Sequence, residues 1–196
     1  MTPTTAMPAT RPPCLRRRLA TGGALTLGAA MILGALAGCA GPQVSDYARE
    51  QPVLDLRQYL SGPLTAHGMF TDRSGRVVKR FTVALTGTWT GDRGELQEDF
   101  SYSDGSTQRR VWHLQQTGPG RFTGRADDVV GEARGEAAGN ALNWHYTLRL
   151  PVDGREWEVQ FDHWMYLVDS RVMINKARMS KFGLTLGEVT LSFQKP

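Results

Sequence analysis

Apolar and polar residues alternate along most of the chain after Leu64, and Gly or Asp-Gly turns interrupt this alternation every 8 to 15 residues. A period of two places successive side chains on opposite faces of a β-strand, whereas an amphipathic helix needs a period of about 3.6. No long helical period occurs in this part of the sequence. Short strands at such spacing are typical of an antiparallel meander that closes as a sandwich or a barrel. We therefore predict an all-β domain over residues 64–196.

The clearest predicted hairpin is centred on Asp153-Gly154, a dipeptide that favours a two-residue type I′ turn. If these two residues form the loop, the residue numbers of paired positions sum to 307. The apolar side chains of both strands then share one face, so that burial specifies the register. The pairs predicted on this face are Leu150 with Trp157, Leu148 with Val159, Tyr146 with Phe161, Trp144 with His163 and Leu142 with Met165.

A second Asp-Gly pair, Asp104-Gly105, does not give a consistent two-residue turn. Such a turn would place Phe100 opposite Arg109, which mixes the two faces, so we expect a longer loop or a bulge there. The flanking strands are predicted over residues 95–102 and 107–116. Further strands are expected at residues 64–71, 77–90, 121–126 and 171–177, near Leu184, and at 188–193.

Residues 131–139 (GEARGEAAG) form an unusual predicted strand, because one face carries only Gly and Ala while the other begins with Glu, Arg and Glu. Small inward side chains leave space inside a barrel. Either a bulky neighbour such as Trp144 fills this space or a ligand does. A short helix is a further alternative, although three glycines disfavour it.

The first 38 residues have the composition of a secretory signal, with four arginines, no acidic residue and an uncharged stretch rich in Ala, Gly and Leu. Leu36-Ala37-Gly38-Cys39 matches a bacterial lipoprotein cleavage and acylation site. We predict a signal peptide over residues 1–38, a lipid on Cys39, and a tether over residues 39–63 with one short helical turn. An uncleaved membrane anchor is the alternative, and the adjacent arginines leave the export route open.

Charge and cysteine content narrow the possible functions. The chain has 23 basic and 19 acidic residues, and removal of the four leader arginines leaves 19 of each sign. A neutral domain lacks the basic surface that nucleic-acid binding requires, so we expect no nucleic-acid partner. Cys14 lies in the leader and Cys39 would be acylated, so the predicted mature domain has no disulfide.

No sequence pattern specifies a metal site, a cofactor or a catalytic nucleophile. The histidines are isolated from one another, there is no Gly-x-Ser-x-Gly motif, and no phosphate-binding glycine loop occurs. Asp127 and Asp162 lie beside apolar or aromatic segments, where a raised pKa would allow acid–base chemistry. Turn capping or pairing with Lys and Arg explains the same two residues without any catalysis.

Two resemblances favour a barrel over a sandwich. Gly87-Thr88-Trp89 resembles the Gly-x-Trp motif of lipocalin and calycin barrels, in which the Trp packs across the closed end. Several further segments, in the same order, resemble the bacterial lipoproteins grouped as domain of unknown function 3833. These segments are 54–62 (LDLRQYLSG), 87–89 (GTW), 126–131 (ADDVVG), 150–154 (LPVDG), 161–166 (FDHWMY) and 180–183 (SKFG).

The resemblance implies a single up-and-down calycin-like barrel, of about 8 to 10 strands, tethered to the bacterial envelope. It supplies no established activity and no catalytic residues. That family usually has a second Asp after the position of Asp162, where this chain has His163. The non-acidic Ala40 after Cys39 favours the outer membrane in the sorting pattern of such lipoproteins.

We therefore expect an outer-membrane lipoprotein, facing the periplasm, whose barrel binds a small apolar ligand such as a fatty acid. The alternatives are a small-barrel enzyme of isomerase or hydratase type that acts on an envelope lipid, and a non-catalytic interaction module with a filled core. The sequence indicates no oligomeric state. The candidate ligand-binding residues are Trp144, Tyr146, Phe161 and His163 in the interior, with Asp127, Asp162 and Lys181 near an opening.

Overall fold

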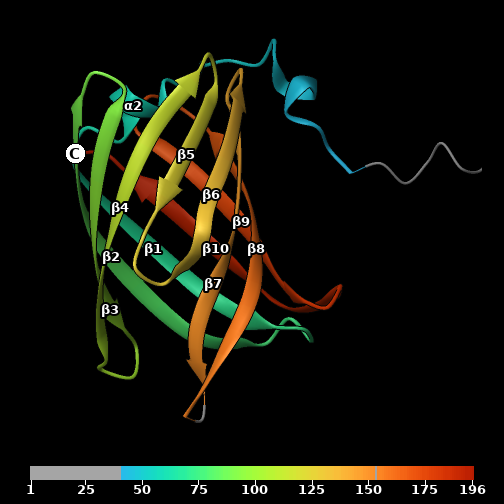
Figure 1. Ribbon diagram of the computed structural model, residues 1–196. Helices are drawn as coiled ribbons and strands as arrows, with labels where there is room; N and C mark the ends of the chain where they lie inside the picture. Colours follow the sequence, from blue (N-terminus) through green and yellow to red (C-terminus); the bar gives the residue numbers. More distant parts are fainter. Residues whose placement is uncertain (1–40, 153) are drawn as a thin grey trace, which may run out of the picture. The chain divides into compact units, whose positions relative to one another are not determined.

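The computed structural model describes residues 41–152 and 154–196, so the predicted signal peptide and Cys39 lie outside the described residues. A short 3-10 helix, η2 (Val44–Tyr47), and one helical turn, α2 (Leu56–Tyr59), precede the strands (Figure 1). Neither of these helices is long and apolar enough to cross a bilayer. The strands are β1 (Gly62–Asp72), β2 (Val77–Thr90), β3 (Arg93–Tyr102), β4 (Thr107–Gly118), β5 (Arg121–Arg125), β6 (Val129–Ala138), β7 (Ala141–Val152), β8 (Arg155–Leu167), β9 (Val172–Lys181) and β10 (Leu184–Gln194).

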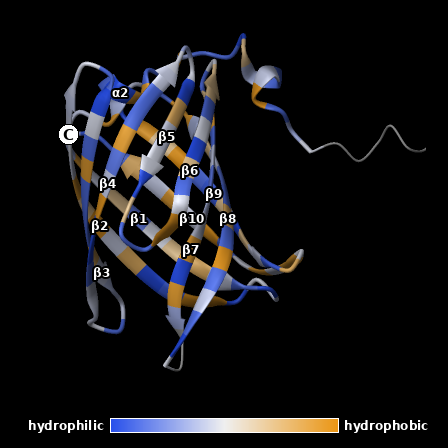
Figure 2. Ribbon diagram, viewed as in Figure 1, coloured by the Kyte–Doolittle hydropathy of each residue, from blue (hydrophilic) through white to orange (hydrophobic). Residues whose placement is uncertain are grey.

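The ten strands form one closed antiparallel barrel in which each strand pairs with its neighbours in sequence and β10 pairs with β1. The predicted all-β, up-and-down barrel is therefore confirmed. Hydrophobic and hydrophilic residues alternate along the strands, as Figure 2 shows. The apolar residues of this alternation face inward and form one continuous core that includes the buried Leu85, Leu96, Phe161 and Met173.

The predicted register of the β7–β8 hairpin is confirmed, with Leu142 opposite Met165, Tyr146 opposite Phe161 and Leu150 opposite Trp157. The strands end at Val152 and begin again at Arg155, as a two-residue connection requires. Trp157 is nevertheless 41% exposed. The hairpin therefore extends beyond the packed part of the barrel, and burial ends before the strand pairing does.

The β3–β4 connection is longer than two residues, as predicted. Ser101 pairs with Thr107, and the backbone N–H of Tyr102 donates to the carbonyl of Ser106 at 2.9 Å. Asp104 accepts hydrogen bonds from the backbone N–H and hydroxyl of Ser106 at 3.0 and 2.6 Å, which holds the loop in shape. The resulting register places Leu96 opposite Trp112 on the inner face.

The small-residue segment is the strand β6, and Trp144 fills the space beside it. A Cβ added to Gly135 would overlap the Trp144 ring, and one added to Gly124 on β5 would lie 2.8 Å from the same ring. A bulge between Val130 and Arg134 changes the predicted alternation. Gly131 lies in that bulge with φ +71° and is exposed, so it does not belong to the inner face.

One end of the barrel is closed by α2. Asp55 caps this helix by accepting hydrogen bonds from the backbone N–H groups of Arg57 and Gln58 at 3.0 and 3.1 Å. Leu56 and Tyr59 are buried against the core. Gly87 on β2 lies directly against the Leu60 carbonyl, and any Cβ there would overlap it. The Gly of the Gly-x-Trp motif therefore permits the end of α2, at Leu60, to lie against the barrel wall.

Candidate functional site

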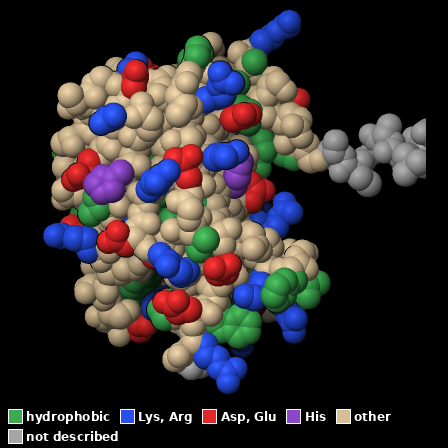
Figure 3. Space-filling view, in the orientation of Figure 1, with side chains coloured by type: hydrophobic (Ala, Val, Ile, Leu, Met, Phe, Trp, Pro, Cys, Tyr) green, Lys and Arg blue, Asp and Glu red, His purple; other side chains and the backbone are tan. Residues whose placement is uncertain are grey.

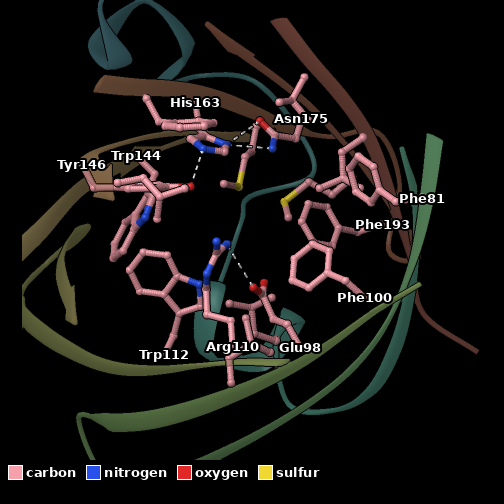
Figure 4. A pocket seen from close by; sticks show the side chains of 18 of the residues that line it. Phe81, Glu98, Phe100, Arg110, Trp112, Trp144, Tyr146, His163, Asn175 and Phe193 are labelled. Carbon is pink, nitrogen blue, oxygen red and sulfur yellow. Dashed lines mark hydrogen bonds and ion pairs between the residues drawn. The ribbon is translucent and has the colours of Figure 1, made fainter. Parts of the chain in front are cut away.

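The barrel interior contains a cavity of about 180 Å³. Most of its lining side chains are Leu, Met, Phe, Trp and Tyr from α2, β1 to β4 and β7 to β10 (Figure 4). The lining residues near α2, such as Leu142, Met173 and Phe193, are buried. Those at the other end, such as Tyr102 and Leu150, are partly exposed. The cavity therefore opens at the end of the barrel opposite α2.

Aromatic rings form much of the wall. Tyr146 stacks on Phe161 with ring centroids 5.3 Å apart, and Trp112 meets Tyr146 and Trp144 edge-on at 5.2 and 5.7 Å. Phe81 packs against further rings on the facing side of the barrel. Such rings present large apolar surfaces at fixed positions, which suits the binding of an apolar molecule.

A charged cluster lies inside the barrel between β3, β4 and the β5–β6 connection. Strand alternation places Glu98 and Arg110 inward, directly opposite each other. Both side chains are 12% exposed, and Arg110 Nη1 lies 3.7 Å from Glu98 Oε2. Arg110 also donates to Asp128 through Nε at 3.0 and 3.1 Å and through Nη2 at 2.7 Å. The guanidinium is therefore hydrogen-bonded to Asp128 through Nε and Nη2, and its Nη1 is only loosely paired with Glu98.

Burial changes the protonation of this cluster. Desolvation raises the pKa of Glu98 to about 6, because it outweighs the positive charge of Arg110 and the hydrogen bond from Trp112. Desolvation acts to lower the pKa of Arg110, but the negative charges of Glu98 and Asp128 contribute to a net rise, so this guanidinium stays charged. Arg110 is thus a fixed cation, and Glu98 is a carboxyl group that titrates close to neutral pH.

A second, neutral polar cluster lies across the cavity on β7, β8 and β9. His163 Nε2 and the Tyr146 hydroxyl are 3.1 Å apart, and His163 Nδ1 lies 2.9 Å from Asn175 Nδ2. Desolvation lowers the pKa of His163 to about 4, so the imidazole is neutral at pH 7. Figure 4 shows this chain of three side chains facing the Arg110–Glu98 pair across the cavity. Each of its members has a hydrogen-bond partner, as buried polar groups require.

The four aromatic and histidine residues expected in the interior, Trp144, Tyr146, Phe161 and His163, all line the cavity. Whether they contact a ligand stays a prediction.

The three candidates expected near an opening lie outside the cavity lining. Asp162 lies on the outer face of β8, opposite His145, where Asn143 Nδ2 donates to it at 2.7 Å. Asp127 is exposed, and its backbone carbonyl accepts from Arg149 Nη2 at 2.6 Å. Lys181 lies at the end of β9, with Nζ 4.6 Å from the centroid of the Trp157 ring. None of these three residues lines the cavity.

Glu98, Arg110 and Asn175 line the cavity but were not among the sequence candidates. The period of two already places Glu98 between Leu96 and Phe100 on one strand face, and Arg110 beside Trp112 on the next strand. The sequence pattern does not specify the register across the β3–β4 loop. That register decides that the Glu98 and Arg110 side chains face each other. Asp128, rather than Asp127, contacts Arg110, because β5 ends at Arg125 and the connection turns only the second Asp inward.

The outer surface differs in character from this interior. Figure 3 shows acidic and basic side chains interspersed on the face that it presents.

Among the described residues, no group of three or more His, Cys, Asp or Glu side chains is placed to hold a metal ion.

A family model described as Protein of unknown function (DUF3833) matches residues 33–195. A curated relative, ribosomal RNA small subunit methyltransferase F from Shigella boydii serotype 4 (strain Sb227), is 36% identical over 67 residues. That match covers 34% of this chain, and the chain spans only 13% of the methyltransferase.

Among solved structures, the S-type phycobiliprotein lyase CPES from Guillardia theta has a TM-score of 0.56 at 6% identity, covering 79% of this chain and 98% of that chain. This likeness shows the fold alone, a calycin-like barrel. A de novo designed fluorescence-activating β-barrel has a TM-score of 0.40 at 14% identity, covering 73% of this chain and 99% of that one. The barrel EF1p2_mFAP2b bound to DFHBI has a TM-score of 0.39 at 12% identity, with 71% and 95% coverage.

Proposed function

We propose that this chain, which belongs to the DUF3833 family, binds a small and mainly apolar ligand inside its barrel, with a polar end of the ligand at the Glu98–Arg110 pair. The observation that carries this proposal is the cavity itself, which has a mainly apolar wall, one open end, the Glu98–Arg110 pair and a neutral polar cluster across from it. Because α2 closes one end and the lining is mainly apolar, a bound ligand would lose contact between its apolar surface and solvent along most of the wall.

The cavity volume limits the size of the ligand. At about 180 Å³, it is somewhat larger than an engineered cavity of ~150 Å³ that binds benzene in another protein. A single aromatic ring or an aliphatic chain of modest length fits inside this space, and a larger apolar molecule would extend through the open end. Met165 and Met173 line the cavity, and their flexible, polarizable side chains can adjust to the shape of a ligand.

The enzyme alternative receives no support from the residues expected to carry it, because neither Asp127 nor Asp162 lines the cavity. The interaction-module alternative required a filled core, and the cavity favours a binding role instead.

Binding can be tested with N-phenyl-1-naphthylamine, an uncharged probe whose fluorescence increases in apolar surroundings. We expect saturable binding by the full chain. Leu191→Trp should abolish it, because Leu191 lines the cavity and the larger ring would occupy the space. Ile174→Trp is the matched control, since Ile174 is 38% exposed and lies outside the cavity lining. Equal probe binding by both variants, or none by the wild type, would contradict internal binding.

We also propose that a lipid on Cys39 anchors the chain to the bacterial envelope, with the barrel in the periplasm. Two or more acyl chains, at roughly 0.8 kcal/mol per buried methylene, make dissociation from a membrane negligible. The lipoprotein motif ending at Cys39 supports this proposal. Metabolic labelling with an alkyne fatty acid should mark the wild type and Cys14→Ser but not Cys39→Ser. Labelling that persists in Cys39→Ser would contradict the anchor.

A further inference from the structure

We infer that the cavity prefers ligands whose polar end is uncharged, such as a hydroxyl or an amide, over ligands that end in a free anionic group. This inference rests on the proposed internal binding and names the chemical class of its ligand. It also opposes the fatty acid expected from the sequence, because a free fatty acid carries a carboxylate at neutral pH.

The charge of the cluster is the first step. Among the described residues that line the cavity, Arg110 is the only Lys or Arg side chain. Its positive charge is already compensated by Asp128, which accepts three hydrogen-bond contacts from the guanidinium at 2.7 to 3.1 Å. Glu98 is a second carboxyl group on the same cation, at 3.7 Å. With both carboxylates ionised, the cluster therefore carries one excess negative charge inside the barrel.

The groups around the pair do not supply a compensating cation. The titratable or hydrogen-bonding side chains that interact with Glu98 or Arg110 are Tyr102 on β3, Trp112 on β4, Asp128 in the β5–β6 connection, Tyr146 on β7 and His163 on β8. His163 is neutral at pH 7, because burial lowers its pKa to about 4. Burial also raises the pKa of both tyrosines, which keeps them neutral. An anionic ligand would add a second uncompensated charge, which a site of low polarity strongly disfavours.

An uncharged polar group, in contrast, fits the open positions of the cluster. Arg110 Nη1 has no hydrogen-bond acceptor within 3.5 Å among the described residues, since its nearest carboxylate oxygen is at 3.7 Å. It can donate to a ligand oxygen. Glu98 can accept from a ligand hydroxyl or amide N–H. One hydroxyl group can therefore satisfy both partners without changing the charge of the cavity.

Protonation of Glu98 should weaken the discrimination. Its pKa is raised to about 6, so the cluster loses its excess charge below that pH. An anion should then bind more tightly at pH 5 than at pH 7.5, whereas the affinity for an alcohol should change little. Glu98→Gln should reproduce this effect at pH 7.5, because glutamine keeps the shape and carries no charge.

The test compares 1-octanol with octanesulfonate, which have the same chain length, as competitors of N-phenyl-1-naphthylamine. The sulfonate stays ionised across this pH range. For the wild type at pH 7.5, we expect octanol to compete at least tenfold better than octanesulfonate. Glu98→Gln should reduce that ratio about tenfold and remove most of its pH dependence. Asp99→Asn is the matched control, because Asp99 is the exposed neighbour on the same strand. Thermal melting should show that both variants are folded.

Each outcome bears on one of the two proposals. Equal or better competition by octanesulfonate at pH 7.5 would overturn the charge preference and leave internal binding intact. An unchanged ratio in Glu98→Gln would also overturn it, because another group would then set the preference. Failure of the probe and of both competitors to bind would overturn the proposed function itself.

Discussion

The hairpin β3–β4 carries two ion pairs side by side, one on each face of the barrel wall. Asp99 pairs with Arg109 on the outside and Glu98 pairs with Arg110 on the inside, in the same register. The outer pair is bidentate at 2.6 and 3.0 Å and largely exposed, at 50% for Asp99 and 67% for Arg109. The inner pair is 3.7 Å apart and 12% exposed on both sides.

The comparison shows that good ion-pair geometry and burial are separate properties of these two pairs. Water already solvates the outer pair, so its hydrogen bonds replace others of similar strength. The inner pair has poorer geometry, but each of its side chains is only 12% exposed. The carboxylate of Glu98 keeps unused hydrogen-bonding capacity that faces a cavity. A ligand can therefore gain more binding free energy from a hydrogen bond to this inner pair than from one to the outer pair.

The largest expected effect comes from removing the inner cation. Arg110→Met should destabilise the chain by about 3 to 5 kcal/mol, because the buried Glu98 and the partly buried Asp128 would both lose their cation. Arg109→Met should hardly change stability, since that pair is exposed. Urea denaturation of the two variants measures the difference. Equal losses would show that the inner and outer pairs are equivalent.

A smaller effect is expected across the cavity. His163→Phe should cost about 2 to 4 kcal/mol, because Tyr146 and Asn175 would each lose a buried hydrogen-bond partner. His145 is the matched outer residue, exposed on β7, and His145→Phe should be nearly neutral. If chemical denaturation shows that His163→Phe is as stable as His145→Phe, the hydrogen bonds of the neutral cluster do not stabilise the barrel.

The pH dependence of stability should separate the two clusters. The pKa of Glu98 is raised in the folded chain to about 6, so its contribution is present below about pH 4.5 and is lost as pH rises to 6, by about 2 kcal/mol. The pKa of His163 is lowered to about 4, so its contribution is present above about pH 6.5 and is lost as pH falls to 4, by about 3 kcal/mol. Between pH 4.5 and 6, the stability contributed by Glu98 therefore falls as pH rises, whereas the stability contributed by His163 increases.

Single variants reveal each slope. Between pH 4.5 and 6, Glu98→Gln should lose stability as pH falls, because only the His163 term remains. His163→Phe should gain stability over the same range, because only the Glu98 term remains. Denaturation series in urea across this range measure both. Parallel profiles for the two variants would contradict the assignment of opposite protonation behaviour to the two clusters.

The smallest effect is expected at Lys181, which lies over the Trp157 and Phe182 rings at the open end and does not line the cavity. Lys181→Ala should change the affinity for an uncharged probe less than twofold. Titration with N-phenyl-1-naphthylamine measures this change. A tenfold loss of probe affinity would show that the binding site extends to the rim of the barrel and is not confined to the interior.

The sequence predicts the elements of this fold well where local chemistry decides them. The strand Val77–Thr90 has the predicted bounds, and the Asp-Gly turn correctly specifies the β7–β8 register. Alternation also places Tyr146 and His163 inward, as predicted.

The charged cluster was not predicted, because it depends on long-range features. The length of the loop 103–106 decides that Glu98 meets Arg110. The end of β5 decides which of two adjacent Asp residues turns inward. The bulge at Gly131 interrupts an alternation that the sequence alone continues. These features depend on how the barrel closes, and no local sequence pattern specifies that closure.

The most direct test of internal binding is native mass spectrometry of the chain purified without added lipid. The wild type should retain a small molecule that gentle collisional activation releases, and the mass of that molecule should correspond to an uncharged amphiphile. Leu191→Trp, prepared in the same way, should show the bare mass. A bare mass for the wild type as well, together with no uptake of added octanol, would contradict the proposal that this barrel holds a ligand.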